Sequence, residues 1–337
     1  MSLYSAETRR LTKRRFTKLF LLGVTLILAA VAVGMFFTNQ KLGPDQIASA
    51  QAQAQQDYER SLEQFGRDLA DCRAAQGTDR ADRWPPNCEG MVEPTREDFQ
   101  AQWYMPATFD FRETFPSMVT TLAALLALVA FIVGASFVGA EWSSGGMMNL
   151  LLWRPQRLRV LGTKLAALLV FFTALTVVFS AVWTGLFHLI AQARGSTAGM
   201  TSGAWQSIAL MELRGLVLVI VAGAVGFGLA SLGRHTAMAL GVTIGALIVF
   251  QFGLGTVLEL AGVKFAEAYL IPIWMIAWMD KEVKIEDSNS CDFSSAAGGC
   301  QPDALTLTWP MAGAILAGVF VLVVVASMWT MRSRDVT

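Results

Sequence analysis

Ionisable side chains at the ends of long apolar runs are the first candidates for chemistry in this sequence. His188, Glu212, Arg214 and Glu259 occupy such positions. Because an ionisable group is costly inside a bilayer and commonly marks a substrate path, these four are candidates for a substrate path or gate. The alternative for each is a polar group that reaches interfacial water. Glu212 and Arg214 stand two residues apart and cannot share a helix face, so we expect no direct ion pair between them.

Motifs for catalysis are missing from the sequence. It has no Gly-x-x-x-x-Gly-Lys-[Ser/Thr] segment for phosphate binding and no His-Glu-x-x-His segment for zinc. The apolar runs also hold almost no Asp, Glu or His from which a proton relay could be built. We therefore expect no catalytic residue, no metal site and no cofactor in this chain. A membrane-embedded enzyme is the alternative, and it requires polar residues that converge in a cavity.

Six long runs without charge must position these residues. They cover 19–37, 118–140, 165–191, 215–232, 236–258 and 307–331. A bilayer core of about 30 Å needs about 20 apolar residues in helical form, and a helix satisfies its own backbone polar groups within lipid. The first run is too long for the apolar part of a signal peptide, so we expect it to be transmembrane helix 1. The sequence predicts an all-α integral membrane protein with six transmembrane helices.

Charge predicts the orientation of these helices. The formal net charge is zero, yet the short segments 1–18, 141–164, 233–236 and 332–337 hold thirteen Lys or Arg residues against three acidic ones. The positive-inside rule places these segments, and both termini, in the cytoplasm of a cell with this protein in its plasma (inner) membrane. Segments 38–117, 192–214 and 259–306 then lie outside. The balanced charge argues against nucleic acid as a partner.

All four cysteines fall in segments assigned to the outside, where disulfides form. They are Cys72, Cys88, Cys291 and Cys300. Four cysteines allow three connectivities, of which the local pairs Cys72–Cys88 and Cys291–Cys300 are the simplest. Each such bridge would stabilise its loop by about 3 kcal/mol. Free buried thiols are the alternative.

The outer segment 38–117 predicts a small extracytoplasmic helical domain between transmembrane helices 1 and 2. Apolar residues three and four apart indicate a long helix over 44–76, and Thr95 with Asp98 indicates the start of another. A lid or spacer and a substrate-binding domain are both open as its role.

Three further patterns concern packing. Phe109, Phe111 and Phe115 alternate with polar residues, which indicates an approach along the membrane interface. Gly241-x-x-x-Gly245 indicates a close contact between helices. The apolar stretch 269–278 is too short to span the bilayer and suits a re-entrant or interfacial segment within the outer loop 259–306.

The inner segment 141–164 carries the most specific pattern in the chain. Glu141 marks the end of the second apolar run, and Gly145-Gly146 allows a sharp turn. Residues 147–153 predict a short amphipathic helix, which Pro155 ends. A short helix that lies along the membrane between two spans can transmit a mechanical push into both of them.

Basic residues follow this short helix. We expect Arg157, Arg159 and Lys164 to face anionic headgroups where the third span begins. A basic anchor on the membrane surface, without any mechanical role, is the alternative reading of the whole segment.

This segment resembles the loop between helices two and three of ABC-2 type permeases, the membrane subunits of a class of ABC transporters. That loop reads roughly Glu-x-x-x-Gly-Thr, then Leu-Leu, Pro-x-x-Arg and Gly-x-Lys. The matching residues are Glu141, Gly145, Leu151, Leu152, Pro155, an Arg at 157 or 159, Gly162 and Lys164, while Gly146 stands where the family usually has Thr. Residues 1–18, with Ala6, Glu7 and Arg10, resemble the amphipathic elbow helix of such permeases.

The resemblance implies a function. Two permease halves, either two copies or this chain and a paralogue, would form a pathway within membrane lipid, and each would dock an ABC ATPase that holds ATP and Mg. ATPase coupling would fall to Glu141, Gly145, Gly146, Leu151, Leu152, Pro155, Arg157, Arg159 and Lys164. The largely uncharged helices two and five would line a path for export of a hydrophobic or amphipathic substrate. An ABC-like sensor or secretion factor that does not transport is the alternative.

Overall fold

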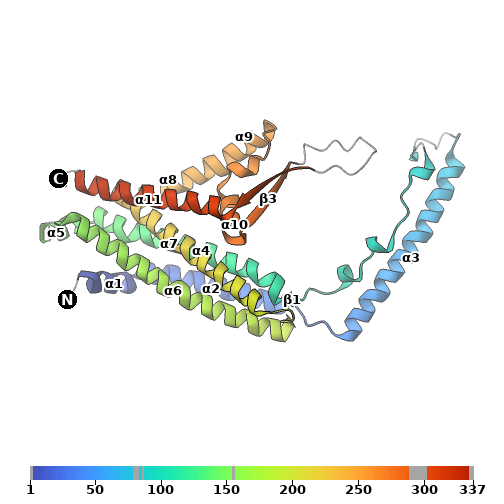
Figure 1. Ribbon diagram of the computed structural model, residues 1–337, viewed down its shortest axis with the longest axis horizontal. Helices are drawn as coiled ribbons and strands as arrows, with labels where there is room; N and C mark the ends of the chain where they lie inside the picture. The colour runs from blue at the N-terminus through green and yellow to red at the C-terminus, as the bar shows by residue number, and fades with distance from the viewer. Residues whose placement is uncertain (1–2, 79–82, 86, 154–155, 288–301, 334–337) are drawn as a thin grey trace. The chain divides into compact units, whose positions relative to one another are not determined.

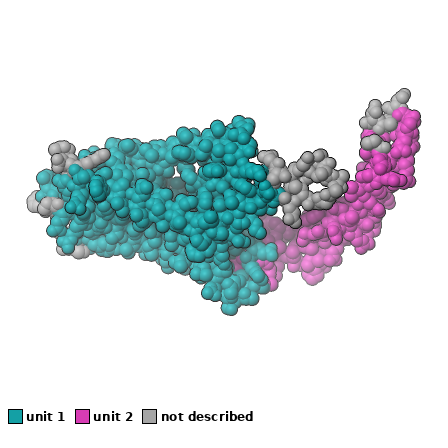
Figure 2. Space-filling view, turned by 45° about the horizontal axis from the view of Figure 1, so that its top comes forward, with its two compact units in different colours: residues 1–32, 112–187, 199–337 teal, residues 33–111, 188–198 magenta. Residues whose placement is uncertain are grey.

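The computed structural model describes residues 3–78, 83–85, 87–153, 156–287 and 302–333. The chain forms two compact units (Figures 1 and 2). Unit 1 comprises Met1–Ala32, Arg112–Phe187 and Gly199–Thr337, and unit 2 comprises Val33–Phe111 and His188–Ala198. Each unit is described by itself.

Six helical segments are long and apolar enough to cross a membrane, as the sequence predicts. They are α2 (Arg15–Thr38), α4 (Phe111–Ser143), α6 (Arg157–Arg194), α7 (Ser202–Gly233), the segment Thr236–Leu260 and α11 (Trp309–Ser333). The fifth segment consists of α8 (Thr236–Ala246), the π-helical stretch η5 (Leu247–Leu254) and α9 (Gly255–Leu260). The all-α membrane fold is therefore confirmed.

Helix α4 forms the core of unit 1, and small residues let its neighbours approach. A Cβ atom added at Gly226 of α7 would lie 2.2 Å from the carbonyl oxygen of Phe131, and one at Gly134 would lie 2.4 Å from that of Gly223. Helices α4 and α7 thus touch along their backbones. By contrast, a Cβ atom at Gly241 or Gly245 would meet nothing within 4 Å. The predicted helix contact at this motif is wrong within this chain, because α8 turns these glycines away from its neighbours.

Short elements complete unit 1 at both ends of the spans. Helices α1 (Leu3–Lys13) and α5 (Gly146–Trp153) lie at one end, and η6 (Ala266–Tyr269) with α10 (Ile271–Asp280) at the other. A hairpin follows, in which β3 (Glu282–Asp287) pairs antiparallel with β4 (Asp303–Thr308). The last span therefore begins at Trp309, two residues later than the apolar run predicts. Cys291 and Cys300 lie outside the described residues.

Unit 2 is built on the long helix α3 (Pro44–Ala75), which confirms the predicted helix over 44–76. In the segment that returns from α3 to α4, residues 87–108 form the single turns η2 (Cys88–Gly90), η3 (Arg96–Asp98) and η4 (Ala101–Tyr104). A disulfide joins Cys72 of α3 to Cys88, as predicted. The second predicted helix is wrong beyond its first turn, although Thr95 caps that turn with Asp98 as expected.

The three phenylalanines before the second span do not lie at an interface. Phe109, Phe111 and Phe115 are each fully buried. Phe109 belongs to β1 (Phe109–Asp110), which pairs parallel with β2 (Gly195–Ser196) in unit 2. Phe115 packs on Phe187 in unit 1 with ring centroids 5.9 Å apart. The interfacial prediction is wrong because these rings pack on protein, namely on the end of α6 and on β2, which follows it.

Candidate coupling site at the junction of α1, α4 and α6

The end of unit 1 that carries α1 and α5 is where the sequence predicts the ATPase-coupling segment. Helix α4 ends just after Glu141, and α6 brings Lys164 there two turns after its start. Helix α1 adds Glu7 on its buried face, beside Leu11. Three helices from distant parts of the sequence thus place charged side chains at one point.

Lys164 is the centre of this group. Its Nζ atom lies 2.7 Å from Glu7 Oε2 and 2.7 Å from Glu141 Oε2. The side chains of Lys164 and Glu7 are both 0% exposed, and Lys164 donates a hydrogen bond to Glu7. The contact with Glu141 is an ion pair without hydrogen-bond geometry. One buried cation therefore holds α1 and α4 to α6.

The predicted contact of Lys164 with lipid headgroups is wrong. The buried residues Val160, Leu161 and Leu168 share its face of α6, so Lys164 belongs to the stripe that packs against protein. A buried ammonium group is tolerated when it is paired and hydrogen-bonded, and Lys164 pairs with two carboxylates and donates a hydrogen bond to that of Glu7. The sequence does indicate this pairing, because Glu7 and Glu141 are two of only three acidic residues in the basic inner segments.

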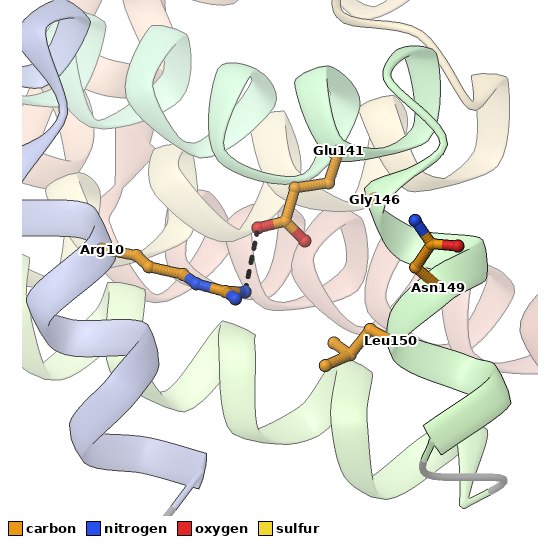
Figure 3. A pocket seen from close by; sticks show the side chains of 5 residues that line it. All are labelled: Arg10, Glu141, Gly146, Asn149 and Leu150. Carbon is orange, nitrogen blue, oxygen red and sulfur yellow. Dashed lines mark ion pairs between the residues drawn. The ribbon is translucent and has the colours of Figure 1, made fainter.

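Two arginines border the buried cation. Arg10 Nη1 lies 3.4 Å from Glu7 Oε1 and 3.9 Å from Glu141 Oε1 (Figure 3). Arg14 Nη1 donates a hydrogen bond of 3.1 Å to the carbonyl oxygen of Ser136 in α4. Burial lowers the pKa of Arg14, and the carboxylate of Glu141 acts in the opposite direction. An arginine keeps its charge in such a setting, so the junction retains three cations and two carboxylates.

Helix α5 follows directly, as predicted. Gly145 takes φ +72°, a conformation that favours glycine and turns the chain from α4 into α5. Met147 and Leu151 are buried one turn apart, whereas Leu152 is 81% exposed. The helix therefore has one face on the bundle and one face open.

A cavity of about 470 Å³ separates α5 from α1 and the end of α4. It is lined by Arg10, Glu141, Gly146, Asn149 and Leu150 (Figure 3). The remaining residues predicted for this site lie at or just before the start of α6. Arg157 is the first residue of α6, Arg159 donates a hydrogen bond to Gln156, and Pro155 lies outside the described residues.

The second predicted group, the candidates for a substrate path or gate, does not form one cluster. Glu212 accepts a hydrogen bond from Thr184 of α6, while Arg214 donates one of 2.9 Å to the carbonyl oxygen of Met279 in α10. The two side chains face different neighbours, as their spacing predicts. Glu259 is exposed near the end of α9. His188 belongs to unit 2, where its ring meets Phe111 edge-on at 5.5 Å.

Helix α10 is fixed to α7 by a reciprocal pair of hydrogen bonds that the sequence does not reveal. While Arg214 donates to Met279, the indole Nε1 of Trp278 donates back to the carbonyl oxygen of Arg214 at 2.9 Å. Asp280 follows at the end of α10, and partial burial raises the pKa of its carboxyl group while Arg214 lowers it.

Comparison with known proteins identifies the family. No curated protein matches the chain. The family model described as ABC-2 family transporter protein matches residues 7–328, which covers both units and all six spans. The chain therefore belongs to the ABC-2 family of transporter proteins, as the segment 141–164 and the six spans predict.

Proposed function

We propose that this chain is the permease subunit of an ABC exporter, with α5 as the helix that receives the motion of a separate ATPase subunit. The observation that carries the proposal is the buried Lys164, which joins α1, α4 and α6 through two carboxylates. A push on α5 enters α4 and α6 directly, since α5 connects them. The ion pairs extend the push to α1, so the three helices respond together.

The open face of α5 supports this role. Leu152 is 81% exposed although it is a large apolar residue at the basic end of the spans. A single exposed leucine is ordinary on a protein surface, but Leu152 stands on the face of α5 that the bundle leaves open, where a partner would dock. The basic residues of α1 and α6 around it attract anionic groups of lipid or of a partner.

The pathway requires a second permease half. Only 6% of the apolar window in Thr236–Leu260 is buried within this chain, against 72% in α4. The surfaces of α8, η5 and α9 are therefore available to a second copy or a paralogue. These segments are almost uncharged, which supports a hydrophobic or amphipathic cargo, moved outward across the plasma membrane with both termini of the chain in the cytoplasm.

A purification from native membranes tests the proposal. We expect the full-length chain to copurify with an ATPase that carries ABC nucleotide-binding motifs, identified by mass spectrometry. ATP and Mg would bind to that subunit. Leu152→Asp is expected to abolish the association because it places a charge at the contact. Val92→Asp is the matched control, because Val92 is an apolar residue that is 87% exposed in unit 2, which carries none of the proposed interfaces. Retention of the ATPase by Leu152→Asp would refute the role of α5.

A further inference from the structure

An apolar groove lies between α2 and α4. The proposed coupling to an ATPase does not involve it. It has a volume of about 340 Å³ and is lined by apolar residues alone. Its floor is formed by Val24 and Val129, which are buried, and its rims by Leu19, Ile27 and Leu128, which are exposed. The groove is therefore a furrow in the surface that the two spans turn toward the bilayer.

The groove has a basic end and an apolar end. Arg14 binds the carbonyl oxygen of Ser136, one turn beyond Ile132 of α4. Because α2 and α4 run in opposite directions, Leu19 and Ile132 lie at this basic end, and Ile27 and Leu125 lie at the far end. Arg15 is exposed one turn before Leu19, on the same side of α2, and forms no ion pair with a described residue. Lys18 is also exposed, but it shares a side of α2 with Leu22 and Thr25, away from the groove.

The dimensions fit one lipid chain. Leu19 and Ile27 are eight residues apart, which is about 12 Å along a helix. A single leaflet contributes about 15 Å of the hydrocarbon core, half of the total. The groove thus runs from the basic end to nearly the middle of the bilayer. A helix from a second copy is about 10–12 Å wide and would cover this furrow without filling it.

We propose that the groove binds one acyl chain of an anionic phospholipid, whose headgroup lies against Arg15. Charge complementarity selects the headgroup, and the apolar furrow between α2 and α4 orders the chain. The proposal is independent of coupling to an ATPase, because the ligand comes from the bilayer and the measurement needs the permease alone. Lipid bound here would brace α2 against α4 next to the Lys164 junction.

Gly23 offers a clean way to fill the groove. It lines the furrow, and a Cβ atom added there would meet nothing within 4 Å. Gly23→Leu therefore occupies the space of the acyl chain without straining the helix pair. Gly241→Leu is the matched control, because a Cβ atom at Gly241 also meets nothing within 4 Å, on a span that does not line the groove.

The experiment is native mass spectrometry of the full-length chain released from nanodiscs with equal parts phosphatidylglycerol and phosphatidylcholine. The wild type is expected to retain one phosphatidylglycerol in preference to phosphatidylcholine. Each displaced methylene is worth about fourfold in affinity, so Gly23→Leu should lower this retention more than tenfold, while Gly241→Leu should not. Leu128→Phe fills the same space from α4 and should reproduce the loss if Gly23→Leu fails to fold.

A second pair of variants tests the headgroup. Each basic residue near a membrane surface contributes about fivefold to the binding of anionic lipid. Arg15→Gln should therefore lower the preference for phosphatidylglycerol about fivefold. Lys18→Gln makes the same charge change on the side of α2 away from the groove and should keep the preference.

Three outcomes would overturn the proposal. In the first, Gly23→Leu and Leu128→Phe both fold and retain phosphatidylglycerol as the wild type does. In the second, the wild type retains both lipids equally. Dissociation of a dimer by Gly23→Leu, without loss of lipid, would instead assign the groove to an interface between copies.

Discussion

Two short helices of unit 1 are attached to the spans by different chemistry. Helix α1 is attached by charge, because Glu7 is buried against Lys164. Helix α10 is attached by hydrogen bonds to backbone carbonyl groups, from Arg214 to Met279 and from Trp278 to Arg214. Loss of one partner at α1 leaves a buried carboxylate without its compensating charge. Loss of one partner at α10 leaves a carbonyl oxygen without its hydrogen-bond donor. The attachment of α1 is therefore the more sensitive of the two.

The largest expected effect comes from Lys164→Met. The variant leaves Glu7 and Glu141 close together without their shared cation, and removal of one partner from a buried pair costs about 3–5 kcal/mol. The free energy of unfolding, measured by denaturant titration in detergent micelles, should fall by this amount.

Lys264→Met is the control for this prediction, because Lys264 forms an ion pair at 3.0 Å with Asp303 in which both side chains are largely exposed. Such a pair contributes at most about 1 kcal/mol. Equal effects of the two variants would show that the Lys164 junction is not a low-dielectric site.

The next effect concerns α10. Arg214→Met removes a charged donor from the carbonyl oxygen of Met279, and hydrogen bonds to charged groups contribute about 1.5–3 kcal/mol. Denaturant titration should show a loss in this range, together with faster hydrogen exchange in α10. Arg67→Met, at an exposed position of α3, should change neither. A larger loss of unfolding free energy than for Lys164→Met would show that the attachment of α10 is more sensitive than that of α1.

A smaller effect is expected for Trp278→Phe. This variant keeps an aromatic ring beside Trp309, whose centroid lies 6.1 Å from that of Trp278. It removes the neutral indole donor together with part of the ring system that packs on Gly313. The lost hydrogen bond should contribute about 1 kcal/mol. Trp329→Phe on the exposed side of α11 should leave the midpoint of thermal unfolding unchanged. No difference between the two variants would mean that the hydrogen bond to Arg214 does not stabilise α10.

The smallest effect lies in unit 2. The backbone N–H and hydroxyl groups of Thr95 both donate to Asp98, and these bonds lower the pKa of its carboxyl group, the backbone bond most. A lowered pKa in the folded state means that the bonds stabilise the turn above the unfolded pKa of about 3.9. This stability is lost as the pH falls through the lower, folded value.

Hydrogen exchange measures this effect at the Thr95 amide. Its protection should fall on acidification in the wild type and be low at every pH in Asp98→Ala, which has no acceptor for Thr95. Asp71→Asn, on the exposed side of α3, should behave as the wild type does. An amide that stays protected at low pH would contradict the sign derived for Asp98.

The spans and α3 could be predicted because their patterns are local. An uncharged run of about 20 residues has one stable form in a bilayer, and the stripe of α3 repeats every three or four residues. The disulfide Cys72–Cys88 could be predicted for the same reason, since its cysteines stand 16 residues apart in one outer segment.

The pairings could not be predicted, because they join distant residues. Lys164 and Glu7 are 157 residues apart, and a lysine at the edge of an apolar run fits a headgroup contact equally well. Arg214 and Trp278 donate hydrogen bonds to backbone carbonyl groups. Every residue has such a group, so no residue type in the sequence marks the partner. Phe109, Phe111 and Phe115 are buried because the end of α6 and the strand β2 lie against them. That placement depends on contacts between residues far apart in the sequence.

The buried pair of Lys164 and Glu7 also bears on the order in which the protein is made. Glu7 leaves the ribosome 157 residues before its partner. At about 5–20 residues per second, that interval is about 8–30 s. Until α6 has been inserted, the carboxylate of Glu7 lacks this cation, so α1 must stay in contact with water or a chaperone. Helix α1 is thus made before α6 but reaches its final position only after α6 is in place, and its arrival marks the assembly of the spans α2, α4 and α6.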